Sequence, residues 1–589
     1  MNKVKKRNGS LEDFSWKKID AAVEKAFKAQ GKDVPPLVYD IVHDTIEIKH
    51  SSDDVTDIED IQDDVVKSII ASGEWDVALA YSSYREKHKE LRFIKERVDW
   101  IDNYMESKEN AATSSETDAN ANVSIKNVAN IDGEVYKSIN RQIQRYRMTK
   151  QLEKQFPEVA KQYVEDLEHH IIYAHDEASS PAVKNYCEAV SLYPLLVDGT
   201  KGMDGLGTVA PKNLSSFCGQ LVNLTFLLSA QCKGAVAFGE FFNFLDYFCT
   251  KDFGPNYHEK AYRVEASAYP KRLIVDAIHQ AYQQIVYGWN QPAGNRSYQS
   301  PFVNISYYDK NYWEALFGEF YFPDGSQPSW ERVNWLQHDF MQWFNNERTK
   351  CLCTFPVETV ALLSDSYDIK DKEWKNFTAE MYSKGHSFFT YISDNPNALA
   401  SCCRLRNEIA ENVFSFTNGL TGVQTGSANV ITLNLNRIVQ DWSKMMMRLN
   451  KGDWTQERAR ESFADLHEYL VDILERVYKY HIAYKTLLYE VEDAGMLNAS
   501  TAGYISMHKL FSTIGINGLN EAAEFLGIKC NYNEEYKEFC RLITGTIAEQ
   551  NRLHSSKDFQ FNTELVPAEG LSSKNYGWDK SDGLEPMAI

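Results

Sequence analysis

A polar stretch, ESKENAATSSETDANANVSI at residues 106–125, divides the sequence into a short part and a long part. It is rich in Ala, Ser, Asn and Thr and has no apolar periodicity, so it cannot bury enough apolar surface to fold by itself. We therefore interpret residues 101–135 as a linker between a small domain, residues 1–100, and a large domain, residues 136–589. A chain of 589 residues is long enough for such an arrangement.

The first hundred residues predict a hairpin that caps a small helical bundle. Asn8-Gly9 lies between two short alternating segments, and an Asn-Gly pair is a strong signal for a tight hairpin turn. Apolar residues then recur at helical spacing in three runs, at residues 19–27, 58–69 and 77–84. The third run is followed by the charged segment YSSYREKHKELR.

Cations gather at the start of this domain. Lys5, Lys6 and Arg7 share one short segment, and Lys18 opens the following helix, where backbone N–H groups already favour anions. These groups could hold a triphosphate while apolar neighbours pack on a base. From the residues alone, a solvated basic N-terminus is the commoner outcome.

The large domain alternates long helical runs with short β-like segments, among them SPFVNISYY, CLCTFPVETVAL and NVITLNLNRI. Strands separated by helices predict an α/β domain, and a barrel is one of the architectures they permit. Two cysteines in one of these segments, Cys351 and Cys353, lie two residues apart on the expected strand. Two thiols are too few for a closed zinc site, so we interpret them as core packing.

The charge balance limits the partners. With 63 basic and 83 acidic side chains the formal charge is −20, which argues against binding to nucleic acid or to an anionic membrane. No run approaches the roughly 18 apolar residues of a membrane span, and the start MNKVKKRNGS lacks the apolar core of a signal peptide. Ten cysteines are too sparse for a disulfide framework. We expect a cytoplasmic protein with reduced thiols.

Cys402 and Cys403 stand side by side and are followed by Arg404 and Arg406. Neighbouring cysteines rarely bridge each other because the geometry is strained, so the pair calls for another explanation. Free cysteine is among the most often buried residue types, and inert packing is the default interpretation for an isolated one such as Cys187.

The pattern V-x-K-R-N-G-x-x-E-x-F-x-x-x-K-I over residues 4–19, with the late YSSYREKHKELR helix, resembles the ATP-cone, a nucleotide-sensing regulatory domain. The resemblance implies an ATP or dATP pocket lined by Val4, Lys6, Arg7, Glu12, Phe14 and Lys18. The resemblance implies that the nucleotide acts as an effector. The sequence contains no GxxxxGK[ST] motif, which agrees with a nucleotide that is not a phosphoryl donor.

Five further segments occur in a fixed order: NYCEAVSLYPLLVDG (185–199), QSPFVNIS (299–306), SCCRLR (401–406), TNGLTGVQTGSANVITLNLNRI (417–438) and FNTELVPAE (561–569). Together they resemble the large subunit of anaerobic (class III) ribonucleotide reductase. The resemblance implies a ten-stranded α/β barrel of the glycyl-radical enzyme type with a finger loop through its centre. It also implies reduction of ribonucleoside triphosphates for deoxyribonucleotide synthesis, under ATP and dATP control.

The same resemblance implies roles for single residues. Cys403, just before the finger-loop arginine, becomes a transient thiyl radical that takes the 3′ hydrogen of the ribose, and Cys187 is the second active-site cysteine. His175 and Asp176 fall near a dimer interface where a second nucleotide selects the base. The roles of Arg404 and Arg406 stay open, as does the reductant, which is formate or a thioredoxin-like or glutaredoxin-like dithiol.

Members of this family continue into a four-cysteine zinc segment and a loop with a glycyl radical, which a radical-SAM activase generates with a 4Fe–4S cluster and S-adenosylmethionine. After Cys540 the printed sequence has no further cysteine, so we expect no metal in it and expect the natural chain to continue. We expect a homodimer or higher oligomer. Two alternatives are a pyruvate formate-lyase-type enzyme, which the adjacent cysteines permit, and a catalytically silent nucleotide-sensing subunit.

Overall fold

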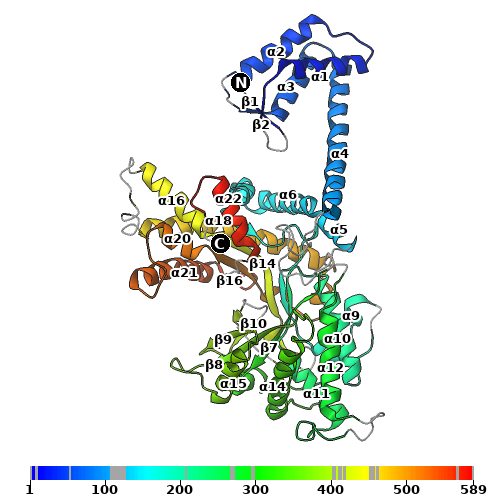
Figure 1. The fold of residues 1–589 in the computed structure, drawn as a ribbon, viewed down its shortest axis with the longest axis vertical. Helices are drawn as coiled ribbons and strands as arrows, with labels where there is room; N and C mark the ends of the chain where they lie inside the picture. Colours follow the sequence, from blue (N-terminus) through cyan, green and yellow to red (C-terminus); the bar gives the residue numbers. More distant parts are fainter. Residues whose placement is uncertain are drawn as a thin grey trace. The chain divides into compact units, whose positions relative to one another are not determined.

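The computed structural model describes residues 3–6, 11–51, 53, 55–106, 128–205, 208–264, 272–293, 299–400, 406–408, 414–415, 419–449, 455, 458, 463–565 and 569–586. The chain divides into two units, residues 1–108 and residues 109–589 (Figure 1). Helix α4, Trp75–Glu106, continues past residue 100, and helix α5, Val128–Glu134, lies within the proposed linker. The boundaries of the linker stay a prediction.

The N-terminal unit is a small sheet on a helical bundle. Strands β1 (Lys3–Lys5) and β2 (Leu11–Asp13) are antiparallel, and β3 (Val55–Asp57), which the sequence analysis did not predict, pairs parallel to β1. The helices are α1 (Trp16–Ala29), α2 (Pro36–His50), α3 (Ile58–Ala71) and α4. The core takes apolar residues from all four helices and from β1. The hairpin on a helical bundle is therefore confirmed.

Local signals explain where two of these helices begin. Pro36 is the first residue of α2, where its missing N–H costs nothing. Asp57 caps α3, because its carboxylate accepts a hydrogen bond from the Glu59 N–H at 3.0 Å.

The second unit is built on one curled sheet. Its strands follow the order β16 (Gln560–Leu565), β15 (Leu510–Asn517), β14 (Thr425–Asn434), β5 (Cys187–Ala189), β6 (Ala235–Phe238), β7 (Phe302–Tyr308), β8 (Val357–Leu363) and β9 (Phe389–Ser393). Strand β4 (Ile172–Ala174) also pairs with β14. Within the described residues the sheet thus has nine strands.

The sheet consists of two parallel halves. Strands β5 to β9 run parallel to one another, as do β14 to β16, and the halves meet where β14 pairs antiparallel with β5. Parallel neighbours need long crossovers, and helices supply them here. The mixed α/β fold with a curled sheet is confirmed.

The connections between the strands contain most of the helices of this unit (Figure 1). Before and after β4 and β5 come α6 (Lys137–Gln155), α7 (Ala160–Glu168), α8 (Tyr193–Asp198), α9 (Lys201–Asp204) and α10 (Leu214–Ser229). The next strands are linked by α11 (Phe241–Phe253), α12 (Ile274–Trp289), α13 (Lys310–Phe317), α14 (Trp330–Glu347) and α15 (Lys372–Ser383). The last part contains α16 (Leu435–Leu449), α18 (Phe463–Asp493), α19 (Asn498–Thr501), α20 (Leu519–Phe525), α21 (Glu534–His554) and α22 (Glu569–Ser581).

The two faces of the sheet differ in chemistry. Successive residues of a strand alternate between faces. On the helix-covered face, Phe238 of β6 stacks on Trp289 of α12 with ring centroids 5.9 Å apart. The opposite face carries small and polar residues, namely Cys187, Ala235, Ala237, Asn304, Ser306, Thr359, Ser427 and Thr513. A face with small side chains can leave space for a ligand or a loop.

Two short hairpins lie between β9 and β14. Strands β10 (Ala398–Ala400) and β11 (Arg406–Glu408) are antiparallel, as are β12 (Phe414–Ser415) and β13 (Gly419–Leu420). Cys402, Cys403 and Arg404 fall between β10 and β11 and lie outside the described residues. Among the helices that the structure describes, none has both the length and the apolar character needed to cross a membrane.

Candidate active site and nucleotide site

Cys187 opens strand β5 and is 2% exposed. The backbone N–H of Ala235, on the neighbouring strand, donates a hydrogen bond to its Sγ at 3.3 Å. The side chains of Tyr186 and Phe302 pack around this pair. Sulfur is a weak acceptor, so this contact contributes little energy but fixes where the thiol lies.

Two glycines allow the backbone to approach Cys187 from both sides. A Cβ on Gly234 would lie 2.7 Å from the Cys187 Sγ, and a Cβ on Gly426 would lie 2.2 Å from the Cys187 carbonyl oxygen. Neither distance is compatible with a side chain at either position. Glycines in a strand often mark a close backbone approach, and this signal in VQTGSANV could have been read from the sequence.

A chain of polar side chains crosses the sheet beside Cys187. Ser427 pairs directly with Cys187 across β14 and β5. The hydroxyls of Ser427 and Thr513 are 3.1 Å apart, and Thr513 donates to the Asn562 Oδ1 at 2.8 Å. These three residues come from three neighbouring strands of one parallel half. They form a connected polar surface next to the thiol.

Asn304 on β7 is the most informative residue of this face. It is fully buried, and among the described residues neither its Oδ1 nor its Nδ2 has a hydrogen-bond partner. It lies two residues beyond Phe302, which packs against the pair formed by Cys187 and Ala235, and it is in register with Ala237, so Asn304 and Cys187 project from the same face. An unpaired buried amide costs roughly 1–3 kcal/mol, so it needs an explanation, and a ligand that pairs with it would supply one.

Asn304 lies in the QSPFVNIS motif but was not predicted as a site residue. An asparagine in the middle of an otherwise apolar strand was the available signal, because asparagine is depleted in strands. Two residues further along, Ser306 forms a hydroxyl pair with Thr359 of β8 at 3.0 Å. Cys403, the predicted radical carrier, lies outside the described residues. Its role stays a prediction.

In the N-terminal unit, Glu12 brings two of the predicted nucleotide-binding cations together. Its carboxylate forms ion pairs with Lys6 and with Lys18, the latter at 2.5 Å. The hydrogen bond from Lys18, followed by that from Lys6, lowers the pKa of Glu12 to about 2. All three side chains are well exposed, so a phosphate group could reach the two ammonium groups.

The other predicted nucleotide-binding residues are placed differently. Val4 is buried in the core of the N-terminal unit, and Phe14 is half-buried, with its ring edge-on to Trp16 at 4.8 Å. Arg7 lies outside the described residues. The structure therefore brings together Lys6, Glu12 and Lys18.

His175 and Asp176 follow strand β4. The His175 Nε2 is 2.8 Å from the Thr432 Oγ1 on β14, and its ring stands edge-on to Tyr173 at 4.9 Å. Asp176 has a φ of 51°, which asparagine and aspartate tolerate better than most residues. No group of three or more His, Cys, Asp or Glu side chains in the described ranges is arranged to hold a metal ion.

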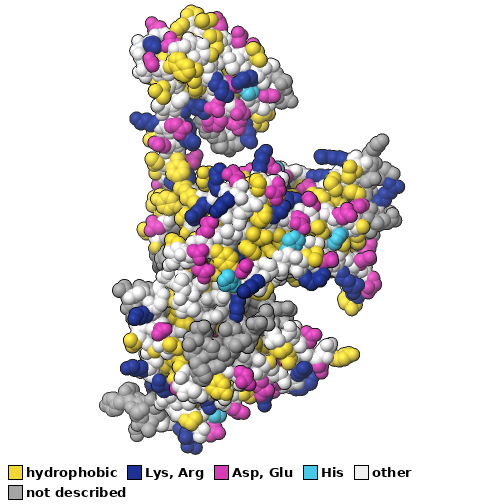
Figure 2. All heavy atoms as spheres, turned by 180° about the vertical axis from the view of Figure 1, so that it is seen from behind, with side chains coloured by type: hydrophobic (Ala, Val, Ile, Leu, Met, Phe, Trp, Pro, Cys, Tyr) yellow, Lys and Arg dark blue, Asp and Glu magenta, His cyan; other side chains and the backbone are white. Residues whose placement is uncertain are grey.

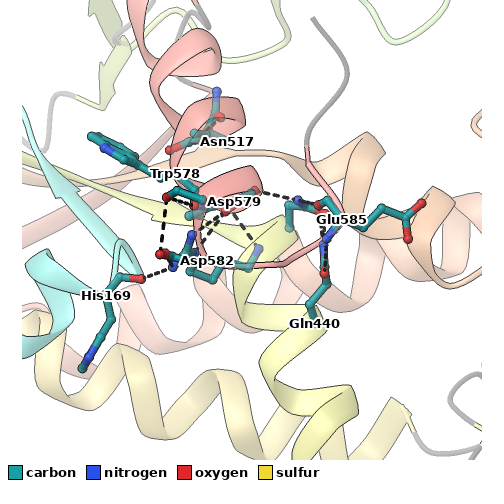
Figure 3. A network of polar contacts seen from close by, with 12 residues as sticks. His169, Gln440, Asn517, Trp578, Asp579, Asp582 and Glu585 are labelled. Atoms are coloured by element: carbon teal, nitrogen blue, oxygen red, sulfur yellow. Dashed lines mark hydrogen bonds and ion pairs between the residues drawn. The ribbon is translucent and has the colours of Figure 1, made fainter. Parts of the chain in front are cut away.

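Helix α22 is fastened to α16 by a buried network of polar contacts (Figure 3). Arg437 donates to Asp579 through Nε at 3.0 Å and Nη2 at 2.7 Å, and its Nη1 donates to Asp582 and to the His169 carbonyl. Gln440 pairs with the backbone of Glu585 in both directions. The network joins distant parts of the chain, since Arg437 and Asp579 are 142 positions apart and Arg437 and His169 are 268 positions apart.

The surface carries both signs of charge. Figure 2 shows acidic and basic side chains interspersed over the described residues of the face that it presents. A mixed surface of this kind fits a protein whose anionic ligands bind at particular places and not along a broad basic field.

Comparisons with known proteins agree with this architecture. A family model described as anaerobic ribonucleoside-triphosphate reductase matches residues 129–584, and one described as ATP cone domain matches residues 2–90. A search of curated proteins found no match.

Solved structures supply further comparisons. The anaerobic ribonucleotide reductase from Thermotoga maritima with glycerol in the active site is 26% identical, with a TM-score of 0.64, and the match covers 78% of this chain and 70% of that chain. Its complex with dATP and CTP is 26% identical, with a TM-score of 0.64, covering 77% and 71%. Another structure, titled anaerobic ribonucleotide reductase, is 26% identical, with a TM-score of 0.66, covering 84% and 71%.

A curled α/β sheet with a buried thiol on its polar face, joined to a small nucleotide-binding unit, defines an oxidoreductase with an attached regulatory domain. The chain belongs to the anaerobic ribonucleoside-triphosphate reductase family and carries an N-terminal ATP-cone. It is therefore an enzyme of nucleotide reduction under allosteric control by nucleotides, as the sequence predicted.

Proposed function

We propose that this chain converts ribonucleoside triphosphates to 2′-deoxyribonucleoside triphosphates at the polar face of its sheet, with Cys403 and Cys187 as the reacting thiols. The observation that carries the proposal is that the buried Cys187 lies on the same face of the sheet as Asn304, whose amide has no hydrogen-bond partner among the described residues. A buried thiol, and an amide that no described residue meets, suit a site that binds a ribose. The complex of the Thermotoga maritima enzyme with CTP supports a ribonucleotide substrate.

A glycyl radical, generated by a radical-SAM activase with its 4Fe–4S cluster and S-adenosylmethionine, would supply the unpaired electron that turns the Cys403 thiol into a thiyl radical. Cys403 then takes the 3′ hydrogen atom of the ribose. The 2′ hydroxyl leaves as water once it is protonated, and Cys187 gives a hydrogen atom to the sugar. The Cys187 sulfur, left as a thiyl radical, regains a hydrogen atom and the sugar gains one electron, both from formate or from a dithiol, and Cys403 then returns the 3′ hydrogen.

The residues of this chain hold the sugar and the thiol in place. The Ala235 N–H fixes the sulfur of Cys187 from the side of β6, while Gly234 leaves the sulfur room. The amide of Asn304 offers one acceptor and one donor group, which match the two hydroxyls of a ribose. A buried site excludes water and so protects a radical from side reactions.

For the ATP-cone, we propose that Lys6, Arg7 and Lys18 bind the triphosphate of ATP or dATP. The exposed ion pairs of Glu12 with Lys6 and Lys18 support this, because a triphosphate carries more charge than one carboxylate and would compete for both ammonium groups. Phe14, which packs against the core, would offer its aromatic ring to a base, and Val4 anchors strand β1 in the core.

The same proposal places a second effector site near His175 and Asp176, at an interface of a homodimer or higher oligomer. The Thermotoga maritima enzyme has a structure with dATP bound in the specificity site, which supports a second nucleotide site of this type.

Asn304→Leu tests the active site in a way that separates function from folding. Leucine has a similar size and removes the unpaired amide, so the free energy of unfolding should stay equal or rise by about 1–3 kcal/mol. Turnover should fall by about 10²-fold or more, since the polar contact to the substrate is lost. The assay measures deoxynucleotide formation under anaerobic conditions with the activase, on a chain that includes the radical segment.

Cys187→Ser and Cys403→Ser are the companion variants, because an O–H bond is too strong to exchange hydrogen atoms with a ribose. Neither variant should form deoxynucleotide. Turnover near that of the unaltered enzyme in the Asn304→Leu variant would reject the assignment of this face as the substrate site. No product from the unaltered, activated enzyme would favour the silent nucleotide-sensing alternative.

A further inference from the structure

A second pair of cysteines lies in the loop between α14 and β8. The sulfur atoms of Cys351 and Cys353 are 3.3 Å apart. Both cysteines were predicted to lie on a strand and to pack in the core, but β8 begins only at Val357. Cys353 is buried, whereas Cys351 is partly exposed. The interpretation as core packing therefore holds for Cys353 alone.

The protein holds these two sulfurs at close range from several sides. Cys351 Sγ lies 3.5 Å from the Tyr287 hydroxyl, and that hydroxyl donates to the Glu347 carboxylate at 2.6 Å. Arg348 Nε donates to the Cys353 carbonyl at 3.3 Å. The loop is thus tied to α12 and α14 by side chains on both sides of the pair.

The end of the loop is tied down as well. The Phe355 N–H donates to the Asn290 Oδ1 at 3.0 Å, and the Asn290 Nδ2 donates back to the Phe355 carbonyl at 2.6 Å. The Phe355 ring packs on Phe302 with centroids 5.0 Å apart, and Phe302 packs against the pair formed by Cys187 and Ala235. One aromatic pair therefore separates this loop from the strand of the catalytic thiol.

The residue between the two cysteines is turned to the solvent. Leu352 is 77% exposed, although leucine is an apolar side chain. A single exposed leucine needs no explanation by itself. Between two thiols in contact, one of them accessible, it gives an incoming sulfur compound an apolar surface to rest on.

We propose that Cys351 and Cys353 form a redox-active dithiol at the surface of the enzyme, which exchanges with the disulfide of a small molecule or of a dithiol protein. In the oxidising direction the Cys351 thiolate attacks the external disulfide, and the first external thiolate leaves. The Cys353 thiol then loses its proton and attacks the Cys351 sulfur, and the second external thiolate leaves. Two thiols of the chain are oxidised, and one external disulfide is reduced to two thiols.

The environment gives the two cysteines different roles. Burial, together with the contact to Cys351, raises the pKa of Cys353 to about 12, so Cys353 stays protonated at neutral pH. The accessible Cys351 is then the attacking thiol, and Cys353 is the resolving thiol, which reacts only when a disulfide has formed next to it. Exposed disulfides are the ones that thiols reduce readily, so the exchange is reversible.

Trypsin isolates this pair in a single peptide. Cleavage after Lys350 and Lys370 releases CLCTFPVETVALLSDSYDIK, which contains only these two cysteines of the chain. The full chain is equilibrated anaerobically with mixtures of oxidised and reduced glutathione, and the remaining thiols are blocked with iodoacetamide before digestion. We expect this peptide to become two hydrogen masses lighter, with neither cysteine blocked, as the share of oxidised glutathione rises.

Cys530 and Cys540 are the internal control. They are also partly exposed, and trypsin places them on separate peptides, CNYNEEYK and EFCR. Neither peptide should lose its blockable thiol at the glutathione ratio at which the 351–370 peptide is oxidised.

Two variants test which cysteine attacks the disulfide and which one resolves it. With Cys353→Ser, Cys351 should stop at the mixed disulfide with glutathione. With Cys351→Ser, modification of Cys353 should slow by at least about tenfold, because the remaining thiol is buried and protonated. The proposal is overturned if the 351–370 peptide keeps two blockable thiols throughout the glutathione series, or if a mixed disulfide on Cys351 accumulates in the unaltered chain.

Leu352→Ala identifies the source of the disulfide. A slower reaction with an oxidised CxxC protein, at an unchanged rate with glutathione, assigns a protein partner to the site. If the variant reacts with both reagents as fast as the unaltered chain does, the partner is a low-molecular-weight disulfide.

Discussion

The attachment of helix α22 offers a sharp test of how burial sets the strength of an ion pair. One guanidinium, that of Arg437, holds two carboxylates on this helix and its end (Figure 3). Arg437 and Asp579 have side chains that are 5% and 0% exposed, whereas Asp582 is 45% exposed. Asp579→Asn and Asp582→Asn make the same chemical change to partners of one arginine, at two different depths.

The expected magnitudes differ because the buried charge cannot return to water. Breaking a buried pair from one side costs about 3–5 kcal/mol, since it leaves a charge without compensation. Arg437 keeps its contacts to Asp582 and to the His169 carbonyl, so we expect the lower end, about 3 kcal/mol, for Asp579→Asn. An exposed pair contributes about 0–1 kcal/mol, so Asp582→Asn should cost no more than that.

Limited proteolysis measures the difference locally. Lys574 and Lys580 lie in α22, so trypsin cuts there only when the helix opens. With fast closing, the rate follows the population of the open form, and each 1.4 kcal/mol is a factor of ten. Asp579→Asn should therefore speed cleavage by about a hundredfold and Asp582→Asn by less than about fivefold. Cleavage at Lys67 in α3 is the internal standard. Equal, small effects of both variants would refute the argument that the buried pair fastens the helix.

Three further predictions follow from single residues. Gly234→Ala should lower turnover strongly, because the added Cβ would lie 2.7 Å from the Cys187 sulfur. Gly219→Ala is the control and should leave turnover unchanged, because its Cβ would meet nothing closer than 3.7 Å. Equal turnover of the two variants would contradict the packing argument. Burial lowers the pKa of Lys485 from 10.5 to about 7. Between these two pH values Lys485 is protonated in the unfolded chain and neutral in the folded one, so it makes the free energy of unfolding rise with pH, by at most about 1.4 kcal/mol per pH unit. Lys485→Met should remove that rise from urea midpoints measured against pH; a curve parallel to that of the unaltered protein would show that the residue does not titrate in this range. Lys6→Ala should weaken ATP and dATP binding in calorimetric titrations of the full chain, and unchanged affinity for both would remove Lys6 from the proposed nucleotide site.

Local patterns were sufficient for several features of this protein. The Asn-Gly pair and the helical spacing in residues 1–100 predicted the hairpin and the helices of the N-terminal unit, because turn propensity and side-chain periodicity are properties of neighbouring residues. The alternation of helical and β-like segments predicted the α/β fold. The ordered motifs predicted the family, and Cys187 was singled out among ten cysteines.

Other features depend on which strands lie side by side. Strand β3 is formed only because residues 55–57 pair with β1. The antiparallel meeting of β14 and β5, which places Ser427 opposite Cys187, joins segments 240 positions apart and leaves no mark on either segment alone.

The tertiary structure alone decided which polar groups lack a hydrogen-bond partner among the described residues, and which side chains are crowded or exposed. Asn304 is a candidate substrate ligand because no described residue forms a hydrogen bond with its amide, and Asp579 is held in place because Arg437 comes from a distant helix. The contact between Cys351 and Cys353 likewise comes from a loop that the strand pattern had concealed. The sequence determines periodicity, which is local, whereas burial and hydrogen-bond satisfaction are sums over neighbours that folding brings together.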